Sequence, residues 1–528
     1  MPSLNYRVYY SMGALSRGGP GLELDCDDGL GFTEISPEIH LTHSATSRTI
    51  SVRKLQIQEN RLVISPRPKA ALVSLFALLA LPIHAQITLL AVGTLTDSAA
   101  GSNADLSGLT YKLENGSPAN FLGGLGSGIA YASGNTFLAL PDRGPNAIAY
   151  NSAIDDTASY INRFHTINMD LQSNPPGSTR LFTLTPTLES TTLFWSLTPL
   201  VYGNGPEFKA PPGRPPINST RQYYFTGRSD NFDPDRNSGD GNDARFDTEG
   251  IRVSNDGLSV FISDEYGPYI YRFARFSGMR LQVYRLPEAF YVPKLKAVGN
   301  DEISGNTSGR TANKGMEGLA ITPDGKTLVG IMQNALIQDS TAGATKLLRM
   351  VSIDIETGDT RQYGYLLTTG SGVSEIVALN NHEFLVDERD GNGRANGNNA
   401  AVKQLFKIDL SGAVEISAMD GPTAAKNTVS KTLFLDLVKT FNASGIDSSQ
   451  IPAKIEGLAF GADVTSGPVT FHTLWVANDN DFLTTVTLAS GALTPNPNQF
   501  FVFGFTDADL NGSQYVPQQF SNLASMLK

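Results

Sequence analysis

A phrase of alternating apolar and polar residues recurs along the chain. In the fullest copy, residues 247–265 read DTEGIRVSNDGLSVFISDE, and residues 315–333 (GMEGLAITPDGKTLVGIMQ) match them position for position. Apolar side chains alternate along the first segment, Asn-Asp-Gly or Pro-Asp-Gly follows, and a short apolar run then ends in acidic or amide residues. Alternation with a period of two predicts a β-strand, and a glycine-containing turn between two such segments predicts a hairpin. Each copy therefore predicts a strand, a tight turn and a second strand.

Looser copies occupy residues 126–144, 373–390 and 455–481. Successive openings at Glu249, Glu317, Glu375 and Glu456 lie 68, 58 and 81 residues apart. One four-stranded blade of a β-propeller needs roughly 40–50 residues plus insertions, so each copy fits one blade. The gap of 122 residues between Ser127 and Glu249 has room for one more. We expect an all-β fold, a single β-propeller of six blades with seven as the alternative; a β-sandwich would not give such regular self-similarity.

A signal for export lies unusually far from the start of the chain. Two basic residues precede an apolar run over residues 70–81, and a small residue, Ala85, follows it. A charged segment, a short apolar run and a small residue define a secretory signal, and 12 apolar residues are too few to span a bilayer. A buried helix is the alternative. We interpret residues 1–62 as a non-native upstream extension, residues 63–85 as the signal peptide, and residues 86–528 as the propeller domain.

Composition narrows the choice of partners. The net charge of −11 and the pI near 5.1 argue against nucleic acid, because no basic stripe is present to replace counterions on phosphates. The single cysteine, Cys26, precedes the export signal, which leaves the mature chain without a disulfide or a zinc–thiolate site. Only His165, His382 and His472 follow Ala85. From the export signal we expect a secreted or periplasmic protein with no membrane span in its mature form. We also expect it to be a monomer.

The repeated glutamates are candidate metal ligands. Blades of a propeller converge on a central channel, so the glutamates that open the copies would share one cavity, and the glycine that follows most of them would let neighbouring backbones approach closely. Several carboxylates in one cavity need cations or shared protons, and calcium suits oxygen ligands without histidine or cysteine. The alternative is that each glutamate braces the backbone of the next blade. The candidate ligands in the channel are Glu249, Glu317, Glu375, Glu456 and Asp479.

An acidic loop precedes the 247–265 copy and could hold a separate calcium ion. Its alternation of Asp233, Asp235 and Asn237 resembles a calcium-binding loop, although Gly239 comes one place late for an EF-hand. The alternative is a solvated polar loop.

The ends of the predicted second strands are the better candidates for chemistry. Acidic residues there could activate water, with Glu265 or Glu388 as the general base, and two arginines could grip a phosphate or carboxylate through both nitrogens. The alternative is a set of salt bridges on the rim. The candidate catalytic residues are Asp264, Glu265, Asp387 and Glu388, and the candidate substrate-binding residues are Asp142, Arg143, Lys314, Arg389 and Asn478.

These phrases resemble the family described as having esterase-like activity of phytase. The matching words are DRGPN at 142–146, SDEYGP at 263–268, NKGMEG at 313–318, FLVDERD at 384–390 and NDNDF at 478–482. The resemblance extends from about residue 120 to residue 482 and implies a propeller fold and hydrolysis of ester bonds.

No Gly-x-Ser-x-Gly motif is present, which disfavours a serine esterase. We therefore expect an exported ester hydrolase that uses calcium, with a small phosphomonoester as the substrate. One alternative is a lactonase or sugar-ester hydrolase similar to gluconolactonase-type propellers. The other is a non-catalytic propeller that binds a ligand at the cell surface.

Overall fold

The computed structural model describes residues 87–96, 103–146, 148–203, 213–488 and 490–521. All of them belong to one compact unit, Ala80–Lys528. The expected upstream extension at 1–62 and the signal peptide at 63–85 lie outside the described residues. Within the described ranges, no helix combines the length and the apolar character needed to cross a membrane.

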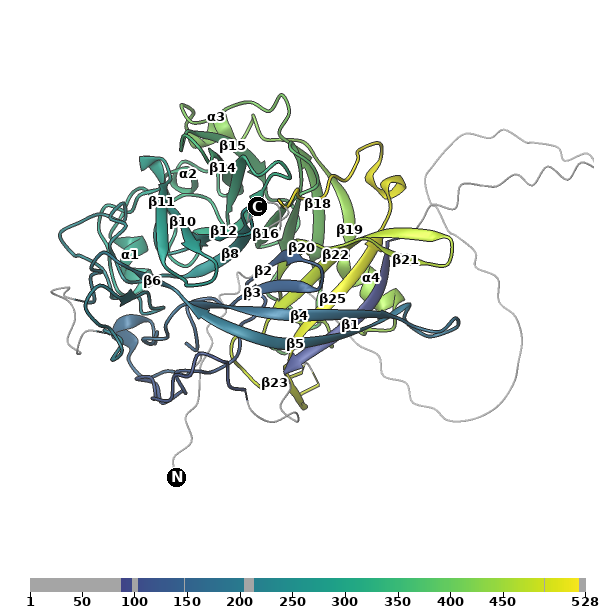
Figure 1. Ribbon diagram of the computed structural model, residues 1–528. Coiled ribbons are helices and arrows are strands. Elements are labelled where there is room, and N and C mark those ends of the chain that lie inside the picture. The colour runs from purple at the N-terminus through teal and green to yellow at the C-terminus, as the bar shows by residue number, and fades with distance from the viewer. Residues whose placement is uncertain (1–86, 97–102, 147, 204–212, 489, 522–528) are drawn as a thin grey trace, which may run out of the picture. The chain divides into compact units, whose positions relative to one another are not determined.

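Four blades are each formed by one continuous stretch of chain (Figure 1). Every blade is a four-stranded antiparallel sheet, as the alternating phrases predict. Blade 1 holds β2 (Gly128–Ser133), β3 (Thr136–Leu140), β4 (Arg163–Ser173) and β5 (Phe182–Leu193). Blade 2 holds β8 (Thr248–Val253), β9 (Ser259–Asp264), β10 (Tyr269–Ala274) and β11 (Arg280–Arg285). Blade 3 holds β12 (Met316–Ile321), β13 (Thr327–Met332), β14 (Leu347–Asp354) and β15 (Thr360–Leu366), and blade 4 holds β16 (Gly372–Ala378), β17 (Glu383–Arg389), β18 (Lys403–Asp409) and β19 (Lys431–Asp436).

Blade 5 combines strands from the two ends of the described chain. Its strands run from β20 (Lys454–Phe460) through β22 (Val469–Asp479) and β25 (Asn498–Phe505) to β1 (Thr88–Thr96), and β21 (Val464–Ser466) adds a hairpin to β22. In Figure 1 the purple β1 lies along the yellow β25. The innermost strands β2, β8, β12, β16 and β20 contact one another in that order, and β20 also contacts β2. The ring of blades is therefore closed.

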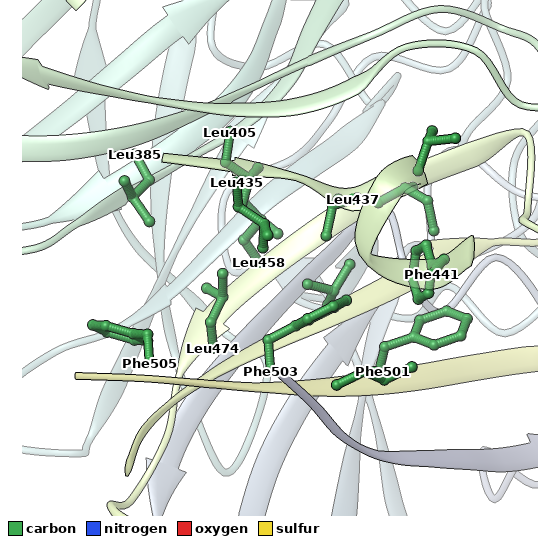
Figure 2. Packing of buried hydrophobic residues seen from close by; sticks show 14 of the residues in the cluster. Leu385, Leu405, Leu435, Leu437, Phe441, Leu458, Leu474, Phe501, Phe503 and Phe505 are labelled. Atoms are coloured by element: carbon green, nitrogen blue, oxygen red, sulfur yellow. The ribbon is translucent and has the colours of Figure 1, made fainter. Parts of the chain in front are cut away.

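Hydrophobic side chains fill the space between neighbouring blades. Figure 2 shows the cluster between blades 4 and 5, where Leu385 and Leu405 of blade 4 face Leu458 and Phe503 of blade 5. Fully burying one such leucine or phenylalanine contributes about 1.5–3 kcal/mol. This packing holds the inner strands at fixed positions around the channel.

The remaining elements are short. They are η1 (Ser152–Ile154), η2 (Glu288–Phe290), α1 (Gly299–Ser304), α2 (Ile337–Thr341), α3 (Gly421–Ala424), α4 (Leu437–Ala443) and η3 (Asp507–Leu510), with the pairs β6 (Trp195–Ser196)–β7 (Tyr223–Tyr224) and β23 (Thr485–Thr487)–β24 (Leu493–Pro495).

The structure gives an all-β propeller but does not confirm the expected six or seven blades. Five sheets form blades in the described part of the chain, four of them with four strands and the fifth with β21 as an additional strand. The long gap before Glu249 is filled by β4 and β5, which have 11 and 12 residues, and by loops with the small β6–β7 pair. One of these loops packs closely against the segment after β3, since Gly227 leaves no room for a Cβ against the carbonyl of Arg143. Spacing alone does not distinguish an insertion of this length from a blade.

The end of the described chain crosses the channel opening at the C-terminal ends of the inner strands. There the half-buried Val516 donates its backbone N–H to Leu379 O at 2.8 Å, and Ser521 donates to Asn255 O at 2.7 Å. The ring of Tyr515 packs 4.7 Å from that of Phe460, and the ring of Phe520 lies 5.9 Å from that of Tyr131. The segment thus contacts blades 1, 2, 4 and 5. The backbone N–H of Gln519 donates to Pro323 O, so the segment contacts blade 3 as well.

Candidate functional site

A β-bulge marks the opening of the repeated phrase in blades 2 to 5. The pairing register skips one residue at Glu317 in β12 and at Glu456 in β20, and a similar shift spans Glu249 in β8. A bulge re-aims the extra side chain away from the regular face of the sheet. All three glutamates line one cavity of about 430 Å³ at the N-terminal ends of the inner strands.

The glycines behind these glutamates allow the blades to converge. A Cβ at Gly250 would lie 2.6 Å from Leu319 Cβ, and one at Gly318 would lie 2.8 Å from the backbone of Glu375. Real Cβ atoms are not found at such distances, so only glycine fits both places. The expected close approach of neighbouring backbones is confirmed.

Glu375 differs from the other three repeated glutamates. In β16 the bulged residue is Ser374, so Glu375 occupies the place that glycine takes in blades 2, 3 and 5. A shift of one residue turns a side chain to the other face of a strand. Glu375 is fully buried, accepts hydrogen bonds from the backbone N–H groups of Leu319 and Ile376 at 2.9 Å, and pairs with Arg252. It is absent from the lining of the cavity, and its contacts are those of a brace between blades.

Arg389 of blade 4 lines the cavity, whereas Glu375 of the same blade does not. Its Nε donates to Ser374 Oγ, its Nη2 donates to Glu456 Oε1, and Nη2 also lies 3.8 Å from Glu317 Oε1. Placement of a guanidinium between two carboxylates offsets part of their repulsion.

The other cations of the cavity are also paired. Arg143 Nη1 lies 2.5 Å from Asp247 Oδ2 and donates to Asn313 Oδ1. Lys454 Nζ lies 2.5 Å from Asp479 Oδ2 and 2.7 Å from Asp481 Oδ1. A third cation, Lys314, donates to Gln333 Oε1 at 3.1 Å.

Carboxylates nevertheless outnumber cations in the cavity. Burial and repulsion by Glu317 raise the pKa of Glu249 well above its usual range. Burial raises the pKa of Asp142 and of Glu265 to about 7. Near neutral pH the cavity therefore holds extra protons, or a cation in their place. The lining carboxylates are Asp142, Glu249, Glu265, Glu317, Glu456 and Asp481, and the lining cations are Arg143, Lys314, Arg389 and Lys454.

Two groups of three acidic residues have the geometry to hold a metal ion. One oxygen atom from each member lies within 4.8 Å of the others in both groups. Such an all-oxygen donor set fits calcium, which prefers carboxylate ligands. The groups found among the described residues are Asp142, Asp479 and Asp481, and Asp247, Glu249 and Glu265.

Sequence reasoning missed three of the residues that build this cavity. Asp247 and Lys454 stand two residues before Glu249 and Glu456, so a signal was present at a fixed position of the phrase. Asp481 lies in the turn after β22, and its backbone N–H donates to Asp479 Oδ1 at 2.7 Å. Its approach to Asp142 comes from the closure of blade 5 against blade 1 and has no sequence signal.

Glu388, expected as a possible base, lies on the opposite face of β17 from Arg389. Tyr365 Oη donates to it at 2.7 Å, the backbone N–H of Thr369 donates at 2.8 Å, and Lys431 forms an ion pair with it. Although burial opposes ionisation, these hydrogen bonds lower the pKa of Glu388 to about 2. Glu388 is therefore ionised at neutral pH, and it lies outside the cavity.

Three other expected site residues are also buried outside the cavity lining. Asp264 accepts hydrogen bonds from the backbone N–H groups of Asp247 and Gly267 at 3.0 Å, and burial raises its pKa to about 8. Asn478 accepts from Gln499 N at 2.7 Å. Asp387 is fully buried, and no described residue gives its carboxylate a hydrogen bond.

The acidic loop before blade 2 forms Asx turns. Asp233 Oδ1 accepts from Asp235 N at 3.0 Å, and Asn237 Oδ1 accepts from Gly239 N at 2.9 Å. In the described ranges this loop is not among the groups of acidic residues that converge on one point. Its side chains hold their own backbone, and a calcium ion there stays a prediction.

Comparison with known proteins finds a family whose profile matches more than half of the chain. The profile of the family described as "Phytase-like: Esterase-like activity of phytase" matches residues 120–482. An uncharacterized secreted protein of Arthroderma benhamiae is 35% identical over 189 residues, which are 28% of this chain and 35% of that protein. The match thus spans about a third of the length of this relative.

Two solved structures match at lower identity. The periplasmic gluconolactonase of Pseudomonas aeruginosa is 12% identical, with a TM-score of 0.29 over 79% of this chain and 99% of that chain. A luciferin-regenerating enzyme is 10% identical, with a TM-score of 0.29 over 76% of this chain and 97% of that chain.

Proposed function

This chain belongs to the phytase-like family described by esterase-like activity of phytase, and on that premise we propose that it is an exported, calcium-assisted hydrolase of phosphomonoesters. The observation that carries the proposal is the cavity at the N-terminal ends of the inner strands. It combines six lining carboxylates with two arginines and two lysines in one enclosed space. Such a mixture can hold a divalent cation and an anionic ester together.

The residues present fit calcium better than a transition metal. Asp247, Glu249 and Glu265 form the group most enclosed by protein, since all three are buried. Neither histidine nor cysteine takes part, which excludes the ligands that zinc and copper prefer. When bound, calcium would neutralise phosphate oxygens and lower the pKa of a coordinated water.

Glu265 is the residue that we assign as general base. Its Oε1 accepts a hydrogen bond from Gly315 N at 2.9 Å, which fixes the direction of the carboxylate. In the metal-free protein burial raises its pKa to about 7. A calcium ion beside it would lower this pKa, so the carboxylate would be ionised at neutral pH and able to accept a proton from water. Arg143 and Arg389 line the same space and would bind the phosphate oxygens.

Export rests on the signal peptide expected at 63–85, whose apolar run spans residues 70–81, and on the relative described as secreted. N-terminal sequencing of the protein recovered outside the cytoplasm checks it. We expect cleavage after Ala85, and a mature N-terminus within residues 1–60 would contradict this interpretation.

Phosphatase assays with p-nitrophenyl phosphate test the activity. We expect EDTA to abolish turnover and calcium to restore it, because the carboxylates repel the phosphate when no cation is bound. Glu249→Gln should weaken the dependence on calcium, whereas the exposed Glu189→Gln on β5 should not. Turnover of a lactone without phosphatase activity would favour a lactonase. Absence of both activities, with stability unaffected by chelation, would favour a binding propeller.

A further inference from the structure

A second cavity, of about 260 Å³, adjoins the acidic one. Arg143 and Asn313 line both of them. The second cavity lies between the start of blade 2, α1 and the loop that leads into blade 3. Its charged lining residues are Arg143, Asp155, Arg245, Lys296, Glu302 and Arg310.

Two buried arginines share one carboxylate in this cavity. Arg310 Nη2 lies 2.6 Å from Glu302 Oε1, and Arg245 Nη2 lies 3.5 Å from Glu302 Oε2. The side chains of all three residues are at most 3% exposed. Four lining cations face two lining carboxylates, so the positive charge is in excess here, in contrast to the adjoining cavity.

The guanidinium groups are not saturated with hydrogen bonds. No described residue accepts a hydrogen bond from Arg310 Nη1 or from Arg143 Nε. Arg245 Nη2 also has no hydrogen-bond acceptor among the described residues, and the 3.5 Å contact with Glu302 is too long to supply one. A buried donor without an acceptor is unfavourable, and more so when it is charged, so an oxyanion that accepts from these groups would relieve this cost.

Contacts with neighbouring residues fix the positions of the two arginines. Arg310 Nε donates to Tyr266 O at 2.9 Å. The Arg245 guanidinium packs 5.2 Å from the Tyr266 ring and 4.9 Å from the Phe232 ring, and its Nη1 donates to Ser229 O at 3.3 Å. Donors fixed in this way lose little side-chain entropy when a ligand binds.

We propose that this cavity, which we call the arginine pocket, binds an oxyanion group through Arg245 and Arg310. The further step, which rests on the proposed function, is that the substrate carries a second anionic group beside the ester that is hydrolysed. Arg143 lies between the two cavities and would contact the ligand on both sides. A phosphate and a carboxylate share the required chemistry, because arginine binds both through paired N–H donors.

Isothermal titration calorimetry on the EDTA-treated full-length protein tests the arginine pocket without calcium and without turnover. Inorganic phosphate and malonate are the two probes. We expect at least one of them to bind, and binding of malonate alone would assign a carboxylate. Arg310→Gln and Arg245→Gln should each weaken binding about tenfold or more, whereas Arg310→Lys should recover part of the loss.

Arg285→Gln is the matched control, because it removes one positive charge from an exposed position on β11 of blade 2, next to the loops that form the arginine pocket. Thermal unfolding confirms that each variant is folded. Failure of both probes to bind, or binding that persists in both glutamine variants and is lost only in Arg389→Gln, would overturn the proposal. Binding that depends on Arg310 in a protein without phosphatase activity would sustain the arginine pocket and contradict the proposed hydrolase.

Discussion

Arg252 Nη2 lies 2.9 Å from Glu375 Oε2, and this buried ion pair joins blade 2 to blade 4 across the channel. Arg252 also donates to Ile129 O of blade 1 at 2.8 Å and to Ile376 O of blade 4 at 2.9 Å. One side chain thus ties together three inner strands, of which β8 and β16 are not neighbours in the ring. Neither residue lines the acidic cavity, and Arg252 lines the cavity at the opposite ends of the inner strands.

Arg252→Met should destabilise the protein by about 3–5 kcal/mol, because it leaves the Glu375 carboxylate buried without its partner. Urea unfolding measures the loss. Lys439→Ala is the control, since it removes an ion pair with Asp436 in which the lysine side chain is 80% exposed, and it should change the unfolding free energy by less than about 1 kcal/mol. Equal effects of the two substitutions would contradict the role of the pair.

Glu265→Gln should lower kcat by about a hundredfold or more, because the amide can no longer accept a proton from water. Glu388→Gln should leave kcat of the folded protein nearly unchanged, because Glu388 faces Tyr365, Thr369 and Lys431 instead of the cavity. Steady-state assays on purified, folded protein compare the two variants. A large loss in Glu388→Gln together with normal turnover in Glu265→Gln would reverse the assignment.

The repeated phrase predicted the two inner strands of each of the five blades and the hairpin between them, because their alternation and turns are local properties of the chain. It also predicted a shared cavity for Glu249, Glu317 and Glu456. It failed at Glu375, where the phrase reads Ser-Glu instead of Glu-Gly. The bulge at Ser374 sets the register there, and only the pairing with β17 reveals it.

The sequence could not predict which residues from different loops come together. Asp481 meets Asp142 only because the last blade closes against the first. Arg245 and Arg310 are 65 positions apart and converge on Glu302 through the packing of loops around blade 2. The prediction of a sixth blade was not confirmed, because long strands and a folded insertion occupy the same length of chain as a blade would.

Stability of the metal-free protein should fall as pH rises from about 4 to about 7. Asp142 and Glu265 have a pKa of about 7 in the folded protein, so the folded state binds more protons than the unfolded state in this window. Their stabilising effect is complete below pH 4 and is lost above pH 7. We expect a decrease on the order of 5 kcal/mol between pH 5 and pH 8 in urea unfolding with EDTA.

Calcium should reverse this decrease at pH 8, because it binds the ionised carboxylates in place of the protons. The double substitution Asp142→Asn and Glu265→Gln should flatten both the pH dependence and the response to calcium. A metal-free protein that becomes more stable between pH 5 and pH 8 would show that these carboxylates are not protonated in the cavity.

The C-terminal segment should contribute to stability but not to the chemistry of the acidic cavity. A chain that ends at Ser513 loses the contacts of residues 515–521 with all five blades, including the Tyr515–Phe460 and Phe520–Tyr131 ring contacts. We expect a decrease in Tm of about 4–8 °C, because the half-buried aromatic side chains and the backbone hydrogen bonds are lost together. KM should stay the same at 25 °C, since the segment crosses the channel at the opposite ends of the inner strands from Glu249, Glu317 and Glu456. Differential scanning calorimetry and steady-state assays measure the two effects. Tyr515→Ala should reproduce part of the decrease in Tm, and a truncated protein with an unchanged Tm and a changed KM would contradict the separation of the two ends.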